Sequence, residues 1–351
     1  MSQQPNIAGY QQAATPAGTA PPPADPAGPA GGGKARELRV LPEGVATAAI
    51  LAGVWILLIV ASTIYRGNFL SRETLLSVTF TMAVAGVLTV GQSLVTISGG
   101  VLDLSIPTLL ILPTWIMATL LTRGFSLWLT LLIGLAVGTA WGCLNAAIIV
   151  FGKLNPIIVT LGTNFAGAAI LGIYVQNAVI PVHSGLSTWG KEYSLGLPNV
   201  FWVMAAIVAV AGYLLPRTRV GRRALAVGGN PQAAKMRGIS LRKTRFGIFM
   251  TAGLLGGVAA ILFTASQSTF VSSDGTTYLF LTIAATLVAG IGLSGGYGNL
   301  WVTFLSVGLL STIPTSLAFF GVPSLWQSVP SGVIVIIAVA IDGYRRKRSA
   351  R

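Results

Sequence analysis

Leu127–Val150 reads LWLTLLIGLAVGTAWGCLNAAIIV, a run of 24 residues without one charged side chain. About 20 such residues in an α-helix are long enough to cross the hydrocarbon core of a bilayer. Similar runs recur along the chain, in which 53% of the residues are hydrophobic and only 9% are charged. The sequence therefore predicts an all-α fold, a polytopic bundle of membrane helices. No loop is long enough to form a soluble catalytic domain.

Glycine recurs at every fourth position of this run, at Gly134, Gly138 and Gly142. Residues four apart lie on one helix face, and small residues there allow another backbone to approach closely. Asn145 follows on nearly the same face, where a polar amide would be costly in lipid, so we expect it to point into the bundle. It either bonds to a neighbouring helix or belongs to a solute pathway.

The apolar runs predict ten transmembrane helices in total, some of them interrupted. The other nine are expected at Val45–Tyr65, Thr74–Ile97, Ser105–Thr122, Pro156–Val179, Asn199–Leu215, Phe246–Ser268, Tyr278–Leu293, Leu300–Phe319 and Leu325–Ile341. Because the number of spans is even, both ends of the chain should lie on the same side of the membrane.

Most basic residues gather in three places that this layout puts on one side. They are the segment from Lys34 to Arg39, the region from Arg217 to Arg245, and the end of the chain from Arg345. Loops rich in Lys and Arg remain in the cytoplasm, so we expect both termini there and the protein in the inner membrane. The net charge of +14 then reflects topology, and no nucleic-acid partner is expected.

Three regions follow from this layout. Residues 1–44 are rich in Pro, Ala and Gly and are expected to form a disordered cytoplasmic tail. Residues 45–342 form the membrane domain, with a basic cytoplasmic loop at 216–245. Residues 343–351 form a basic cytoplasmic tail. The first apolar run shows no cleavage site, so it should remain as a helix.

The basic loop contains Val220–Arg245, VGRRALAVGGNPQAAKMRGISLRKTR, without one Asp or Glu. Proline is favoured at the first position of a helix, and asparagine is favoured just before it. The loop therefore predicts a short helix over Pro231–Met236 with Asn230 as its N-cap. Such a folded element on the cytoplasmic surface indicates a docking site more than a topological anchor.

Two glycine pairs interrupt the apolar pattern, in Ser98-Gly99-Gly100 and in Ser294-Gly295-Gly296. Non-helical backbone at membrane depth is tolerated where it is buried in protein or lines a cavity. Paired breaks are compatible with an internal repeat. Asp103, beside the first break, is the one carboxylate in the inner apolar stretches. It either caps the next helix, which has Pro107 near its start, or acts on a solute or in coupling.

Motifs for nucleotide and metal binding are not formed. Gly28–Lys34 and Gly185–Lys191 fit GxxxxGK, but neither is followed by Ser or Thr, and neither follows a strand. His183 is a lone histidine in a predicted external loop, Ile180–Pro198, without further metal ligands. We therefore expect no cofactor, no metal and no enzymatic activity in this chain. Cys143, the single cysteine, lies in an apolar run and forms no intrachain disulfide.

Several segments resemble the permease subunits of sugar ABC importers of the ribose, xylose and galactoside type. They are Gly91–Gly100 with Asp103-Leu104-Ser105, Asn155–Thr163, Gly221–Asn230 with Ala233-Ala234 and Arg237-Gly238-Ile239, and Gly332–Asp342. The resemblance runs in the same order over Ala46–Asp342. This chain departs from the family in having one extra residue between Gly100 and Asp103, and Ile106-Pro107 in place of Val-Gly.

The resemblance implies an importer that works by alternating access. A cytosolic ABC ATPase would use ATP and Mg²⁺, a periplasmic sugar-binding protein would deliver a monosaccharide or related polyol, and a second permease subunit, identical or paralogous, would complete the pathway. Basic residues would also contact membrane lipid. Two other classes stay open from the residues alone, an ion-coupled secondary transporter and a membrane scaffold or sensor without transport.

Residues of two kinds carry this interpretation. Those expected to couple the chain to the ATPase are Gly221, Arg222, Arg223, Gly228, Gly229, Asn230, Ala233, Ala234, Arg237, Gly238 and Ile239. Those expected along the solute pathway are Gln92, Gly99, Gly100, Asp103, Ser105, Asn145, Thr160, Thr163 and Asn164, with Gln176, Trp115 and Trp141 as further candidates. No residue is expected to bind a metal.

Overall fold

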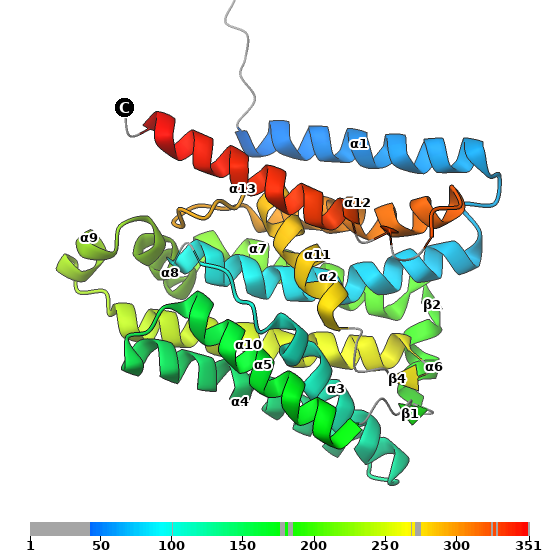
Figure 1. The fold of residues 1–351 in the computed structure, drawn as a ribbon, viewed down its shortest axis with the longest axis horizontal. Helices are drawn as coiled ribbons and strands as arrows, with labels where there is room; N and C mark the ends of the chain where they lie inside the picture. Colours follow the sequence, from blue (N-terminus) through cyan, green and yellow to red (C-terminus); the bar gives the residue numbers. More distant parts are fainter. Residues whose placement is uncertain are drawn as a thin grey trace, which may run out of the picture. The chain divides into compact units, whose positions relative to one another are not determined.

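The computed structural model describes residues 43–99, 101–175, 180–181, 185–267, 269–270, 275–323, 326–327 and 329–349. Ten apolar helices form the bundle (Figure 1), and each coincides with one predicted span. They are α1 (Glu43–Tyr65), α2 (Arg72–Gly99), α3 (Ile106–Thr122), α4 (Leu127–Gly152), α5 (Pro156–Val175), α7 (Asn199–Arg217), α10 (Leu241–Ser266), α11 (Gly275–Val288), α12 (Leu300–Phe319) and α13 (Val329–Ser349).

Among the described residues, seven of these helices are long and apolar enough to cross a membrane. Helix α3 has 17 residues and α11 has 14. At 1.5 Å per residue they extend about 26 and 21 Å, less than the roughly 30 Å of a hydrocarbon core. A crossing by α3 or α11 would need non-helical backbone next to it, which agrees with the interruptions predicted beside both. The apolar part of α13, Val329–Ala340, is also short.

The connections contain three further helices and four short strands. They are β1 (Ile180–Pro181), α6 (Gly185–Lys191), β2 (Tyr193–Ser194), β3 (Leu197–Pro198), α8 (Arg219–Gly229), α9 (Pro231–Met236) and β4 (Thr269–Phe270). Strand β1 pairs antiparallel with β4, and β2 pairs antiparallel with β3. The connection predicted as an external loop is thus largely folded, and its His183 lies outside the described residues.

The folded connections lie at opposite ends of the bundle. In Figure 1, α8 and α9 lie at one end, together with the first residues of α1 and the last residues of α13. Helix α6 and the strands lie at the other end. This arrangement agrees with an even number of crossings.

Helices α2 and α10 form the centre of the bundle and pack against each other. Helix α2 also contacts α7, α11 and α12, while α10 also contacts α3 and α4. From Met82 to Ser93 every residue of α2 is buried. A helix that is buried all round belongs inside the protein and away from lipid. Helix α5, in contrast, packs mainly on α3 and α4 and exposes most of its surface.

The glycine face of α4 packs against a second glycine face on α10. A Cβ atom at Gly138 would lie 2.6 Å from the backbone nitrogen of Gly257, and one at Gly142 would lie 2.8 Å from Cα of Gly253. No real Cβ contact is that short, so both helices need glycine for their backbones to meet. The prediction of a small-residue packing face is confirmed.

Three predicted boundaries are wrong. Helix α11 ends at Val288 and not at Leu293, because Gly290 adopts a φ of +82° and closes the helix with a Schellman motif. Helix α10 begins five residues before Phe246, where the hydroxyl of Ser240 accepts a backbone hydrogen bond. Helix α13 continues through the predicted basic tail to Ser349.

Parts of the predictions fall outside the described residues. They are most of the N-terminal tail, residues 1–42, and the pathway candidates Gly100 and Gln176.

Candidate functional site

Helix α8 has one apolar face on the bundle and one basic face directed outward. The buried face consists of Gly221, Ala224, Val227 and Gly228. The exposed face carries Arg219, Arg222 and Arg223. A side chain on Gly221 would overlap the carbonyl oxygen of Leu215, so the sharp passage from α7 into α8 requires glycine there. The hydroxyl of Thr218 caps α8 by accepting the N–H of Gly221 at 3.1 Å.

Helix α9 is a short helix closed at both ends, as its sequence predicts. The side chain of Asn230 accepts the N–H of Ala233 at 2.9 Å, and Pro231 occupies the first position. At the other end Gly238 has a φ of +78°, and the N–H of Ile239 reaches the carbonyl oxygen of Ala234 at 3.0 Å. This Schellman motif ends α9 and turns the chain toward α10.

The outer face of α9 is open. Met236 is 90% exposed, while Ala234 is only 4% exposed and anchors the helix on the bundle. The backbone N–H of Arg237 extends the helix by bonding to the carbonyl of Ala233 at 3.1 Å, and both of these residues are exposed. The tip of α9 therefore presents one large apolar side chain, Met236, outside the bundle while Ala234 holds the helix against it.

The end of α8 meets both glycine breaks. The N–H of Gly296, in the second break, donates to the carbonyl oxygen of Ile97, near the end of α2, at 2.7 Å. A Cβ atom on Gly228 would overlap that same carbonyl oxygen and lie 2.6 Å from the Gly296 nitrogen. Gly296 itself has a φ of +79°. Three backbones from distant parts of the sequence therefore touch at this glycine junction, which we define as Ile97, Gly228 and Gly296.

The first break is held by side chains. Asp103 accepts two hydrogen bonds from Ser105, from its N–H at 2.8 Å and from its hydroxyl at 2.6 Å. The N–H of Asp103 donates to the side chain of Gln92 at 3.2 Å. The N–H of Leu104 donates to the hydroxyl of Thr160 at 3.0 Å. Each of these three successive N–H groups thus finds a partner, which non-helical backbone at membrane depth requires.

Asn145 extends this network from α4 to α5. Its amide nitrogen donates to the Ser105 hydroxyl at 2.8 Å, and its amide oxygen accepts from Thr163 at 2.7 Å. Its side chain is fully buried, so the expectation that it points into the bundle is confirmed. Asn164, one residue further along α5, accepts from the hydroxyl of Thr108 in α3 at 3.0 Å.

The polar pathway candidates that are described thus lie together around one feature. We call Gln92, Asp103, Ser105, Asn145, Thr160 and Thr163 the break network. Its members are buried except for Thr163, which is half-buried beside the exposed surface of α5. Gly99 ends α2 with ordinary contacts only. Asp103 closes the turn before α3 by bonding to Ser105, the N-cap residue, and it accepts no N–H group from the helix itself.

Comparison with known proteins decides the family. The family described as branched-chain amino acid transport system / permease component matches residues 74–339. The chain belongs to this family. It is a transmembrane permease subunit of the inner membrane, with multiple crossings. No solved structure matches it.

The permease is also similar over most of its length to proteins named for sugar import. It is 31% identical to the ribose import permease protein of Bacillus subtilis (strain 168), over 85% of this chain and 92% of the relative. It is 29% identical to the fructose import permease protein of Rhizobium meliloti, over 84% of each chain. It is 26% identical to the L-arabinose transport system permease protein of Escherichia coli (strain K12), over 84% of this chain and 90% of the relative.

Sequence reasoning on the permease missed three features. The exposure of Met236 could not be predicted, because it depends on how α9 packs on the bundle. The hydrogen bond of Gly296 to Ile97 joins two segments that the sequence marks only as separate breaks. Tyr174 stacks on the candidate Trp115 with ring centroids 5.9 Å apart, and it is largely exposed. The sequence could have indicated this pair by an aromatic residue in each of two helices, α3 and α5, at similar depths in the membrane.

Proposed function

We propose that this permease forms the translocation pathway of an ATP-driven importer for a monosaccharide or related polyol. The observation that carries the proposal is the match over 92% of the length of a relative named as a ribose import permease. Relatives named for fructose and L-arabinose import support the same class of solute. A separate ABC ATPase supplies the energy, a periplasmic binding protein supplies the sugar, and a second permease subunit completes the pathway.

In this proposal α9 receives the ATPase. Its exposed tip, with Met236 and Arg237, enters a groove of the ATPase, while Arg222 and Arg223 on α8 pair with acidic groups of that partner. The many Lys and Arg residues around them favour a cytoplasmic location, and both termini would lie on the same side. In this proposal ATP and Mg²⁺ bind the partner ATPase and not the permease.

The glycine junction transmits the movement of α8. Gly228 lies directly against the Ile97–Gly296 hydrogen bond, so a displacement of α8 pushes on backbone and not on flexible side chains. Packed interfaces respond to such small displacements by switching between arrangements. ATPase closure would in this way change the connection between α11 and α12 and alternate the access of the pathway.

The solute passes beside the break network and not through it. Most of the network's polar atoms bond to one another, so a sugar would have to break these bonds to enter. Thr163 and Asn164 are half-buried at its edge, and the Trp115–Tyr174 pair lies on the same two helices, α3 and α5. Hydroxyl, amide and aromatic groups are the usual contacts of sugars in binding sites.

Replacement of Met236 tests the coupling step. In the importer reconstituted with its ATPase and binding protein, M236E should abolish ATP-driven uptake and the stimulation of ATPase activity by the loaded binding protein. Because Met236 is 90% exposed, the permease should still fold and insert in normal amounts. The conservative M236L variant is the matched control and should transport normally. Normal uptake by M236E would exclude α9 as the coupling element.

A second measurement tests the solute and the energy source. Uptake of radiolabelled ribose, fructose, arabinose and leucine is compared with and without ATP, leucine being included because of the family's description. We expect ATP-dependent uptake of a sugar. Uptake driven by an ion gradient would instead indicate a secondary transporter. Purification without any ATPase or binding protein would favour a scaffold.

A further inference from the structure

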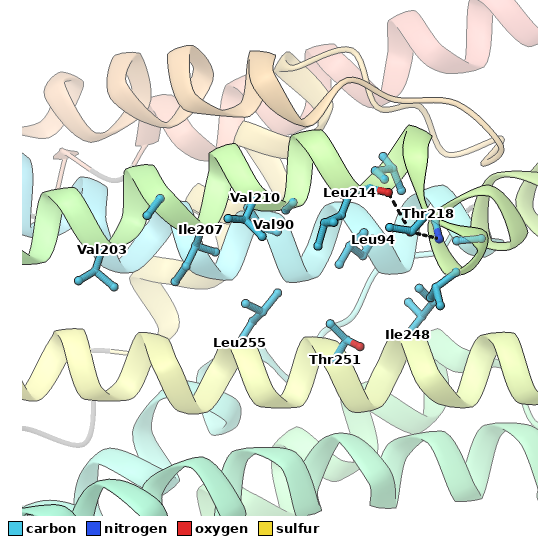
Figure 2. Close-up of a pocket in the computed structure, with 16 residues that line it drawn as sticks. Val90, Leu94, Val203, Ile207, Val210, Leu214, Thr218, Ile248, Thr251 and Leu255 are labelled. Carbon is cyan, nitrogen blue, oxygen red and sulfur yellow. Dashed lines mark hydrogen bonds between the residues drawn. The ribbon is translucent and has the colours of Figure 1, made fainter.

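A long groove lies between α7 and α10, with α2 as its floor and the start of α8 at one end (Figure 2). Its volume is about 640 Å³. It is distinct from the break network and from the tip of α9. The residues that line its length include Val203, Ile207, Val210 and Leu214 of α7, Leu94 of α2 and Leu255 of α10.

The groove is suited to hydrocarbon and not to a sugar. Its two hydroxyl groups are already bonded within their own helices, since Thr218 donates to the carbonyl of Leu214 at 2.8 Å and Thr251 donates to that of Gly247 at 2.8 Å. The remaining lining is aliphatic or glycine. A polar solute placed there would lose its hydrogen bonds to water without replacement. The hydrocarbon tail of a lipid needs no hydrogen bonds there, and it gains van der Waals contacts with the aliphatic lining.

The groove is long enough to hold a lipid tail. From Val203 to Thr218 there are 15 positions along α7, which correspond to about 22 Å at 1.5 Å per residue. Two leaflets of tails together make up the roughly 30 Å hydrocarbon core, so one leaflet accounts for about 15 Å. One acyl chain therefore fits along the groove from the membrane surface inward.

The end of the groove at α8 is strongly basic. Thr218, Val220 and Gly221 line that end, and the neighbouring Arg219 and Arg222 are exposed. On the facing helix α10, Nε of Arg245 is buried without a hydrogen-bond partner among the described residues, one turn before the lining residue Ile248. This single N–H group, buried without a partner, lacks an acceptor that an anion beside it would supply.

Along the sequence, no acidic residue lies near these basic residues. The sequence contains no Asp or Glu between Glu192 and Asp274. Arg242 and Lys243 lie in the first turn of α10, where the positive end of the helix dipole disfavours them. A phosphate group at this place would relieve both effects.

We propose that this groove binds an anionic phospholipid, with one tail between α7 and α10 and the phosphate among the arginines at the α7–α8 corner. The bound lipid fills the space beside Gly221 and Ala224, on the buried side of α8. It thereby fixes the position from which α8 contacts the bundle. Charged lipid is attracted to basic segments by about fivefold in affinity for each Lys or Arg near the membrane surface.

Filling the groove tests the site. Ala206 lines it and is exposed, so A206F places a phenyl ring where the tail would lie. The matched control is A136F, an exposed alanine of α4 away from the groove. Each full-length protein is purified in mild detergent, and native mass spectrometry measures the binding of added phosphatidylglycerol and phosphatidylcholine. We expect one tightly held phosphatidylglycerol on the wild type and on A136F, and its loss from A206F.

The headgroup is tested with R219Q, which should weaken phosphatidylglycerol binding about fivefold and leave phosphatidylcholine binding unchanged. Equal binding of the two lipids by the wild type, or undiminished phosphatidylglycerol binding by A206F, would overturn the proposal. If A206F does not fold, the smaller A206V is measured in the same way and should weaken phosphatidylglycerol binding. Crosslinking of two copies through A206C, in a C143S background, would show that a second permease covers the groove instead.

Discussion

Alanine at position 228 should damage the permease, whereas alanine at position 229 should not. Both glycines end α8. A Cβ on Gly228 would overlap the carbonyl oxygen of Ile97, while one on Gly229 would lie 3.6 Å from Cα of Gly296, an ordinary contact. The overlap on Gly228 involves backbone on both sides, so no side-chain rotation can relieve it.

The expected magnitude follows from three contributions. Overpacking costs about 1–3 kcal/mol, and separating the buried Ile97–Gly296 hydrogen bond costs about another 1–3 kcal/mol. Alanine returns about 1 kcal/mol at either position through its higher helix propensity. G228A should therefore lose about 1–5 kcal/mol of stability, while G229A should be neutral or slightly stabilised.

Thermal unfolding in detergent, followed by tryptophan fluorescence, measures this difference. At 2–4 °C per kcal/mol, a loss of about 3 kcal/mol lowers the melting temperature of G228A by about 6 °C or more. Uptake by the reconstituted importer with G228A should fall more than the loss of folded protein accounts for, because α8 and its coupling contact are displaced. Equal melting temperatures for G228A and G229A would refute the close backbone contact. Normal coupling in G228A would refute its role in transmission.

Three further predictions concern other contacts. G138A should be less stable than G134A by about 1–3 kcal/mol and should therefore melt at a lower temperature, because the new methyl group meets backbone at Gly138 but a movable methionine side chain at Gly134. Equal melting temperatures for the two variants would count against a rigid glycine seam. N145L should cost about 1–3 kcal/mol by leaving buried partners unpaired, and a double-mutant cycle with T163V should show non-additive melting shifts. G238A forces alanine to a φ of +78°, which costs about 1–2 kcal/mol, so amide exchange in α9 should accelerate while the melting temperature of the bundle stays unchanged.

Local patterns in the sequence were sufficient for the elements whose causes are local. Apolar runs of about 20 residues predicted where ten helices lie, since bilayer thickness and helix rise set the length that a crossing needs. The order Asn230-Pro231 followed by Gly238-Ile239 predicts α9, because N-cap and Schellman geometries each depend on a few neighbouring residues. The glycine face of α4 also follows from spacing alone.

Contacts between distant segments could not be predicted in this way. The sequence marks Asn145, Thr163 and Ser105 as polar residues in apolar surroundings, but their mutual distances depend on how three helices cross. The end of α11 was placed too late because Ile291 and Leu293 continue the apolar pattern, while a single glycine with positive φ, Gly290, stops the helix. Hydrophobicity records burial in the membrane and not whether the buried backbone is helical.

The two breaks are stabilised differently, and this difference assigns them different tasks in the proposed mechanism. Side chains from α2 and α5 bind the N–H groups of Asp103 and Leu104, so the first break is held without α8. In the second break, the N–H of Gly296 relies on one backbone carbonyl, that of Ile97, against which Gly228 lies. A movement of α8 therefore disturbs the second break and leaves the network of the first intact. We expect the α11–α12 connection to move during transport, while the α2–α3 connection acts as the fixed part of the pathway.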